Sequence, residues 1–91
     1  MNNTKYVAGY NIWIEQEGGY FSRVEKYNLR QEIEIAVDCA NEVAKEFPGR
    51  AIMIERVVWD MDDVGFEKSD CLMIVQYEDG ELKIVEDHRG A

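Results

Sequence analysis

The chain has 91 residues, a formal net charge of −9, and 46% hydrophobic residues, including 11% aromatics. This length predicts a single domain over residues 1–91, and the apolar content excludes a disordered polymer. The acidity disfavours direct binding to nucleic acid or to an anionic membrane, which both need a basic surface, and it favours a basic protein partner.

The N-terminal part of the chain predicts a β-hairpin. Aromatic and β-branched residues recur at every second position across residues 5–16, which is typical of a strand. Gly18 and Gly19 can supply the positive φ that a tight turn needs. Residues 20–27 are therefore expected to form the returning strand.

One amphipathic helix is predicted over residues 28–47. Asn28 is a suitable N-cap residue, with Gln31 three residues later, and Pro48 and Gly49 end the helix. Its apolar residues recur at helical spacing: Leu29, Ile33, Ala36, Val37, Ala40, Val43, Ala44 and Phe47.

Three further strands are expected after the helix. Residues 50–60 form the first, residues 61–69 an acidic loop, and residues 70–78 and 81–87 a hairpin around Asp79-Gly80, a strong turn signal. The order is β-β-α-β-β-β. We expect an α+β fold in which one helix packs on one face of an antiparallel sheet.

A single helix, about 10 Å wide, covers only one face of such a sheet, yet the strands carry apolar residues on both. We therefore expect an uncovered apolar face, with partial covering by loops as the alternative. Large exposed patches of Trp, Tyr and Met mark interfaces, the simplest of which is a homodimer. The residues predicted for partner binding on this face are Trp13, Met53, Val57, Trp59, Phe66, Met73 and Tyr77.

Acidic residues concentrate in the second half of the chain. Residues 46–91 hold 12 of the 19 acidic side chains but only five of the ten basic ones. Residues 60–67 are spaced like the start of a calcium loop, but Val64 and Cys71 stand where ligands belong, which favours a solvated acidic turn. The predicted acidic partner-binding patch is Glu55, Asp60, Asp62, Asp63, Glu67, Asp70, Glu78 and Asp79.

Catalytic and metal-binding patterns are scarce. His88 is the only histidine, Cys39 and Cys71 lie in apolar patterns, and no phosphate loop or nucleophile elbow is present. We expect no enzyme activity, no cofactor and no metal site, since zinc would need more Cys and His. Two separate thiols and the absence of a signal-peptide pattern in residues 1–5 lead us to expect a cytoplasmic protein.

These features predict a small acidic protein-binding module. Its sharpest version is an inhibitor that occupies a basic, nucleic-acid-handling surface, as phage anti-defence proteins and nucleic-acid mimics do; this is an analogy of size and charge. The alternatives are a structural homodimeric domain of a bacterial or phage protein, a bacterial immunity protein, and a small-ligand binder or enzyme with a cleft beside the sheet.

Overall fold

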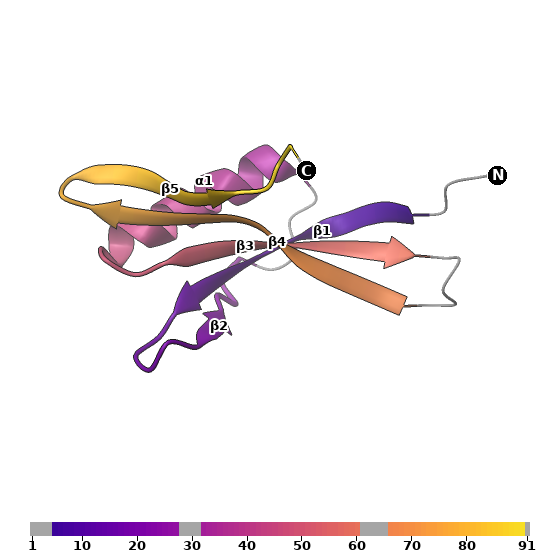
Figure 1. Cartoon of the computed structure of the whole chain (residues 1–91), viewed down its shortest axis with the longest axis horizontal. Helices are drawn as coiled ribbons and strands as arrows, with labels where there is room; N and C mark the ends of the chain where they lie inside the picture. Colours follow the sequence, from indigo (N-terminus) through magenta and orange to yellow (C-terminus); the bar gives the residue numbers. More distant parts are fainter. Residues whose placement is uncertain (1–4, 28–31, 61–65, 91) are drawn as a thin grey trace.

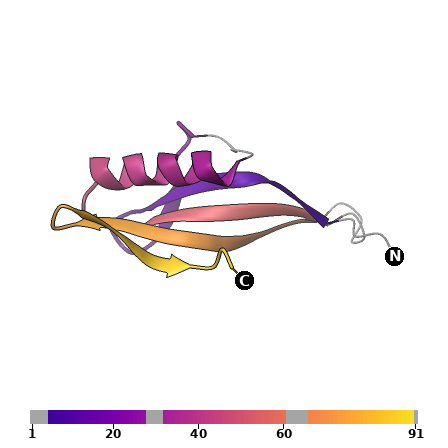
Figure 2. The ribbon, with the colours of Figure 1, turned by 90° about the horizontal axis from the view of Figure 1, so that it is seen from above.

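A computed structural model describes residues 5–27, 32–60 and 66–90. The chain forms the predicted α+β fold, with one helix packed on one face of a five-stranded antiparallel sheet (Figures 1 and 2). The elements are β1 (Lys5–Glu15), β2 (Phe21–Arg23), α1 (Ile33–Glu46), β3 (Ile52–Asp60), β4 (Phe66–Glu78) and β5 (Glu81–Asp87). The strand order is β2-β1-β3-β4-β5, so β2 and β5 are the edge strands.

The core fills the space between α1 and the sheet. Small residues on the buried side of α1, such as Ala36, Ala40 and Ala44, let the helix backbone approach the strands closely. Ile12 of β1 pairs with Ile54 of β3, and both side chains are fully buried. The outer side of α1 is polar apart from the exposed Ile35, largely as the helical spacing predicted.

Local signals fix the ends of several elements. Asp79 and Gly80 both have positive φ, 53° and 78°, which is the turn that the Asp-Gly pair predicted between β4 and β5. After α1, the amide of Gly49 donates to the carbonyl oxygen of Tyr77 at 2.9 Å. This bond ties the connection after the helix to β4 and so helps to set where α1 lies on the sheet.

Three predicted boundaries differ from the structure. The returning strand spans residues 21–23 rather than 20–27, because regular pairing with β1 covers residues 21–23 and is followed by one further bond, from the amide of Val24 to the carbonyl oxygen of Ile12 at 2.8 Å. The helix begins at Ile33; the predicted cap residues Asn28 and Gln31 lie outside the described residues. Residues 66–69 are not loop but the start of β4, which pairs with the end of β3.

The sheet is much longer than the helix. The 14 residues of α1 span about 21 Å, whereas the 13 residues of β4 span about 43 Å. Figure 2 accordingly shows β1, β3 and β4 continuing past the end of the helix. The helix is thus too short for the length of the sheet, and it also leaves β5 beside it rather than beneath it.

Candidate functional site

The most open part of the sheet is its β5 edge. All seven residues of β5 are exposed, and no described strand pairs with its outer side. An edge strand presents unpaired backbone N–H and C=O groups, which can pair with another extended chain. At the opposite edge, β2 has only three residues. The longer site for adding a strand is therefore β5.

Beside β5, a shallow apolar groove separates the strand from α1. It consists of two adjoining hollows of about 240 and 220 Å³, and both include Val37 and Arg89 in their walls. Met73 and Val75 of β4 form the floor, between α1 on one side and β5 on the other. The remaining lining residues are Ile33, Glu34, Asp38, Asn41, Leu82, Lys83 and Ile84.

The apolar wall on the β5 side is formed by Leu82 and Ile84. They pair with Tyr77 and Val75 of β4, so they lie on the helix side of the sheet. Because α1 does not extend over β5, Leu82 stays 38% exposed and Ile84 56% exposed. These apolar side chains lie on the face of the sheet that forms the core, but no element covers them. Exposed apolar residues of this kind are typical of an interface.

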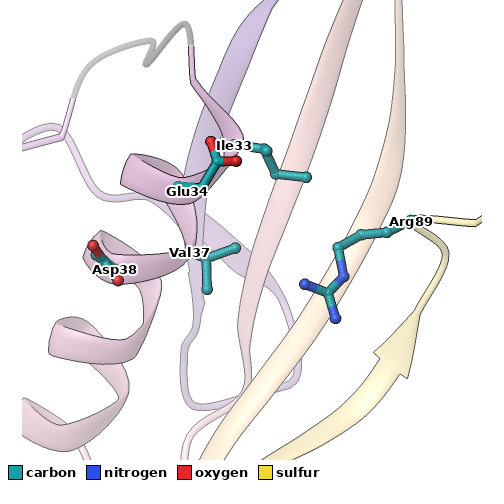
Figure 3. A pocket seen from close by; sticks show the side chains of 5 residues that line it. All are labelled: Ile33, Glu34, Val37, Asp38 and Arg89. Atoms are coloured by element: carbon teal, nitrogen blue, oxygen red, sulfur yellow. The ribbon is translucent and has the colours of Figure 1, made fainter.

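Arg89 lies opposite Val37 where the two hollows of the groove meet. Figure 3 shows its side chain reaching from just after β5 toward α1, with Ile33 and Val37 directed into the space between. The guanidinium Nη2 lies 2.7 Å from Oδ2 of Asp87. Through this hydrogen bond, Arg89 lowers the pKa of the Asp87 carboxyl to about 2, and Asp87 raises the pKa of Arg89. The positive charge of Arg89 in the groove is therefore already neutralised within the chain.

The other charges around the groove are mainly acidic. Lys83 lies 3.9 Å from a carboxylate oxygen of Glu78, so the second basic residue of the groove also has an acidic neighbour. Glu34 and Asp38 are exposed on the α1 side and form no ion pair within the described part of the chain. A ligand that enters this groove meets an apolar floor and a net negative rim.

The predicted acidic patch does not form a single surface among the described residues. Glu55 accepts hydrogen bonds at 3.1 Å from the side chains of Asn11 and Trp13, and Asp70 is held by both Nε and Nη2 of Arg56. Glu78 and Asp79 lie at the far end of the β4–β5 hairpin. The side chains of Asp60 and Glu67 and all of Asp62 and Asp63 lie outside the described residues.

The structure distributes the residues of the predicted apolar face over both sides of the sheet. Trp13 pairs with Met53, and Met53 pairs with Ile74; the three half-buried side chains form a row on the face away from α1. Val57, which alternates onto the same face, is only 3% exposed. The side chains of Trp59 and Phe66 lie outside the described residues.

The assignment of Met73 and Tyr77 to the uncovered face is wrong. Met73 is 2% exposed and Tyr77 is half-buried, and both pack with the core beneath α1. In β4, Met73 pairs with Ile54, whose side chain faces the helix, so Met73 faces the helix as well. A register shift follows between Ile54 and Glu55. Sequence alternation alone does not say which side of a two-sided strand meets the helix.

Comparisons with protein-family models, with curated proteins and with solved structures returned no match. The described residues contain no helix that is long and apolar enough to cross a membrane. The candidate site is therefore judged on its own geometry. Both hollows are open to solvent and not enclosed, so the groove suits individual side chains of an extended chain better than an enclosed ligand.

Proposed function

We propose that this protein is a small acidic protein-binding module, and that it holds an extended, basic segment of a partner along β5. The observation that carries the proposal is the combination of a fully exposed edge strand with an apolar groove on its helix side. In such binding, backbone hydrogen bonds supply affinity and alternate side chains enter pockets. Leu82 and Ile84 would contact the apolar side chains of the added strand.

The charge of the site supports a basic partner. Glu81, Glu86 and Asp87 of β5 outnumber its one basic residue, Lys83, and the chain as a whole has a net charge of −9. On the other side of the groove, Glu34 and Asp38 add two further negative charges. Opposite charges across neighbouring strands stabilise pairing and speed encounter.

The same charges disfavour a second copy of this chain at β5. Two copies of β5 would bring their acidic side chains together, and like charges on adjacent strands are destabilising. Charged residues on an edge strand are a common protection against self-association. A partner segment rich in Lys or Arg removes this repulsion, which is why we favour it over a β5-to-β5 dimer.

A defined peptide tests the proposal. The probe is a labelled seven-residue peptide in which Lys and Val alternate, matched in length to β5; the control peptide replaces each Lys by Glu. Fluorescence anisotropy is expected to show saturable binding of the basic peptide only. Raising the salt from about 0.1 to 1 M should weaken binding strongly, because the screening length falls from about 10 to 3 Å.

Matched variants locate the binding surface. Ile84→Ser should weaken binding about tenfold, since part of an Ile side chain buried in the complex contributes about 1.4 kcal/mol. Tyr20→Ser is the control, because Tyr20 is 63% exposed in the connection between β1 and β2, near the opposite edge. Equal binding by both variants, or equal binding of the acidic peptide, would exclude the β5 groove as the site.

A second pair of variants tests the charge argument. Replacing Glu34 and Asp38 by Gln and Asn should weaken peptide binding and reduce its salt dependence. The charge-matched control replaces Glu17 and Glu25, both exposed at the β1–β2 side, by Gln. If the two double variants behave alike, the acidity acts only through net charge, and the groove rim has no specific part in binding.

In its sharper form, the proposal makes the protein an inhibitor of a basic, nucleic-acid-handling protein. Such proteins present Lys- and Arg-rich surfaces and tails to bind phosphates, and these are the segments that an acidic groove would accept. The test is competition: the wild-type chain should displace a labelled duplex from the basic target, and Ile84→Ser should do so more weakly. If neither displaces the duplex, the inhibitor form is wrong.

A further inference from the structure

A cluster of three potential metal ligands lies where the end of β5 meets β4. Cys71 is in β4, Glu86 is in β5, and His88 follows β5. One donor atom from each, the Cys sulfur, a Glu carboxylate oxygen and a His ring nitrogen, lie within 4.8 Å of one another. Nε2 of His88 is 3.0 Å from Oε1 of Glu86. None of these three side chains lines the groove beside β5, although Glu86 contributes to the negative charge of the strand.

The sheet itself brings the cluster together. Glu86 pairs with Ile74, Asp87 with Met73, and the amide of His88 donates to the carbonyl oxygen of Leu72 at 2.8 Å. Alternate residues of a strand share a face, so Glu86 and His88 project to the same side. Ile74, opposite Glu86, lies in the half-buried row away from α1, which places the cluster on the face without the helix.

The turn after β5 is held by its own contacts. Oδ1 of Asp87 accepts a hydrogen bond from the backbone amide of Arg89 at 3.1 Å and another from Nε of Arg89 at 2.9 Å. Along the chain, Asp87 lies between the two ligand positions and Arg89 directly follows the second, and both side chains point to the groove side. The backbone at Glu86 and His88 is therefore ordered from both sides, which lowers the cost of organising a site.

We propose that Cys71, Glu86 and His88 bind a zinc-class divalent transition-metal ion. Zinc takes thiolate, imidazole and carboxylate ligands at about 2.0–2.3 Å, so the donors of a tetrahedral site lie about 3.3–3.8 Å apart. The donor atoms of the cluster, all within 4.8 Å of one another, exceed this spacing by about 1 Å at most. Magnesium and calcium prefer oxygen ligands and do not fit a donor set that contains sulfur and imidazole nitrogen.

Three protein ligands leave the fourth position of the ion for water or for a donor from a partner.

The sequence-based expectation of no metal site considered Cys and His alone, and it overlooked that the hairpin adds a carboxylate to one Cys and one His. Burial, followed by the charge of Glu86, raises the pKa of the Cys71 thiol, so metal binding has to displace a proton from it.

Cobalt(II) provides the test, because it occupies zinc sites and gives a thiolate-to-metal charge-transfer band in the near ultraviolet when a Cys is a ligand. Titration of the full chain with Co²⁺ is expected to produce this band at one equivalent, and Zn²⁺ should abolish it by displacement. A simple His88–Glu86 ion pair, with no metal site, gives no such band.

Variants of the three ligands distinguish the site from general metal binding by the acidic surface. Cys71→Ser should remove the band, and Glu86→Gln and His88→Gln should each weaken Co²⁺ binding about tenfold or more, since even outer-shell partners of a metal contribute that much. Cys39→Ser is the matched control, because Cys39 is the other free thiol and lies on the buried side of α1. Absence of the band in the wild type, or its loss in Cys39→Ser but not in Cys71→Ser, would overturn the proposal.

Discussion

The assignment of the two sheet faces is tested by a pair of Met→Ala substitutions with identical chemistry. Met73 is 2% exposed beneath α1 and pairs with Ile54, whereas Met53 is half-buried on the opposite face, beside Trp13 and Ile74. Truncating a fully buried Met costs about 2–5 kcal/mol, because its packing is lost and a cavity remains. Met53→Ala removes mainly cross-strand contacts, which contribute about 1 kcal/mol or less.

These costs are large against the total stability. A domain of 91 residues has a free energy of unfolding of roughly 5–14 kcal/mol. At about 4–8 °C per kcal/mol, a 3 kcal/mol cost for Met73→Ala lowers the Tm by about 12–24 °C, against about 4–8 °C or less for Met53→Ala. Urea and thermal unfolding followed by far-ultraviolet circular dichroism measure both. If Met53→Ala were the more destabilising variant, α1 would cover the other face of the sheet.

Two further outcomes follow from single contacts. The Tyr27 hydroxyl donates to Oε2 of Glu42 at 2.7 Å, which raises the Tyr27 pKa to about 12. Because the pKa is raised on folding, this contact adds stability that is present below pH 10 and is lost as the pH rises through 12. Glu42→Gln should return the Tyr27 titration toward pH 10, as measured by tyrosinate absorbance against a Tyr27→Phe reference. At the β4–β5 turn, Asp79 has a φ of 53°, which is the left-handed region that Asn tolerates and β-branched residues do not. Asp79→Val should therefore lower the free energy of unfolding by about 1–2 kcal/mol in urea, whereas Asp79→Asn should leave it nearly unchanged. An equal loss in both variants would contradict a left-handed residue at this position.

The order of elements was predictable because several of the boundaries have a local chemical cause. Asp79-Gly80 favours positive φ at both turn residues, and Pro48-Gly49 cannot continue a helix. Alternation in the strands and 3.6-residue spacing in α1 are likewise local patterns. Where the cause was weak, as in residues 20–27, the predicted strand was longer than the observed one.

The faces of the strands were not predictable in the same way. Register shifts occur between Ile54 and Glu55 and between Ile74 and Val75, and an irregularity of this kind changes which residues of neighbouring strands share a side. The lateral position of α1 over β1, β3 and β4 depends on packing of the whole core. The groove at Leu82 and Ile84 exists because of where α1 lies, and therefore no local sequence pattern predicts it.

The Cys71–Glu86–His88 cluster was hidden for a related reason. The three residues meet only if the β4–β5 register is known, including its shift, and one residue of slip would turn Glu86 and His88 to the opposite face. A search for donor residues on one face of the hairpin, with Asp79-Gly80 as its turn, would have identified Cys71, Glu86 and His88 as candidate ligands. A count of Cys and His residues that ignores the hairpin could not identify them.

Amide hydrogen exchange shows directly whether β5 accepts a basic, extended segment. Exchange of the full chain is measured with and without the alternating Lys-Val peptide at low salt. Slower exchange of the backbone amides is expected across residues 81–87, with no change at residues 21–23 of the other edge strand. Protection confined to β2, or a bound peptide that leaves the β5 amides unchanged, would contradict it.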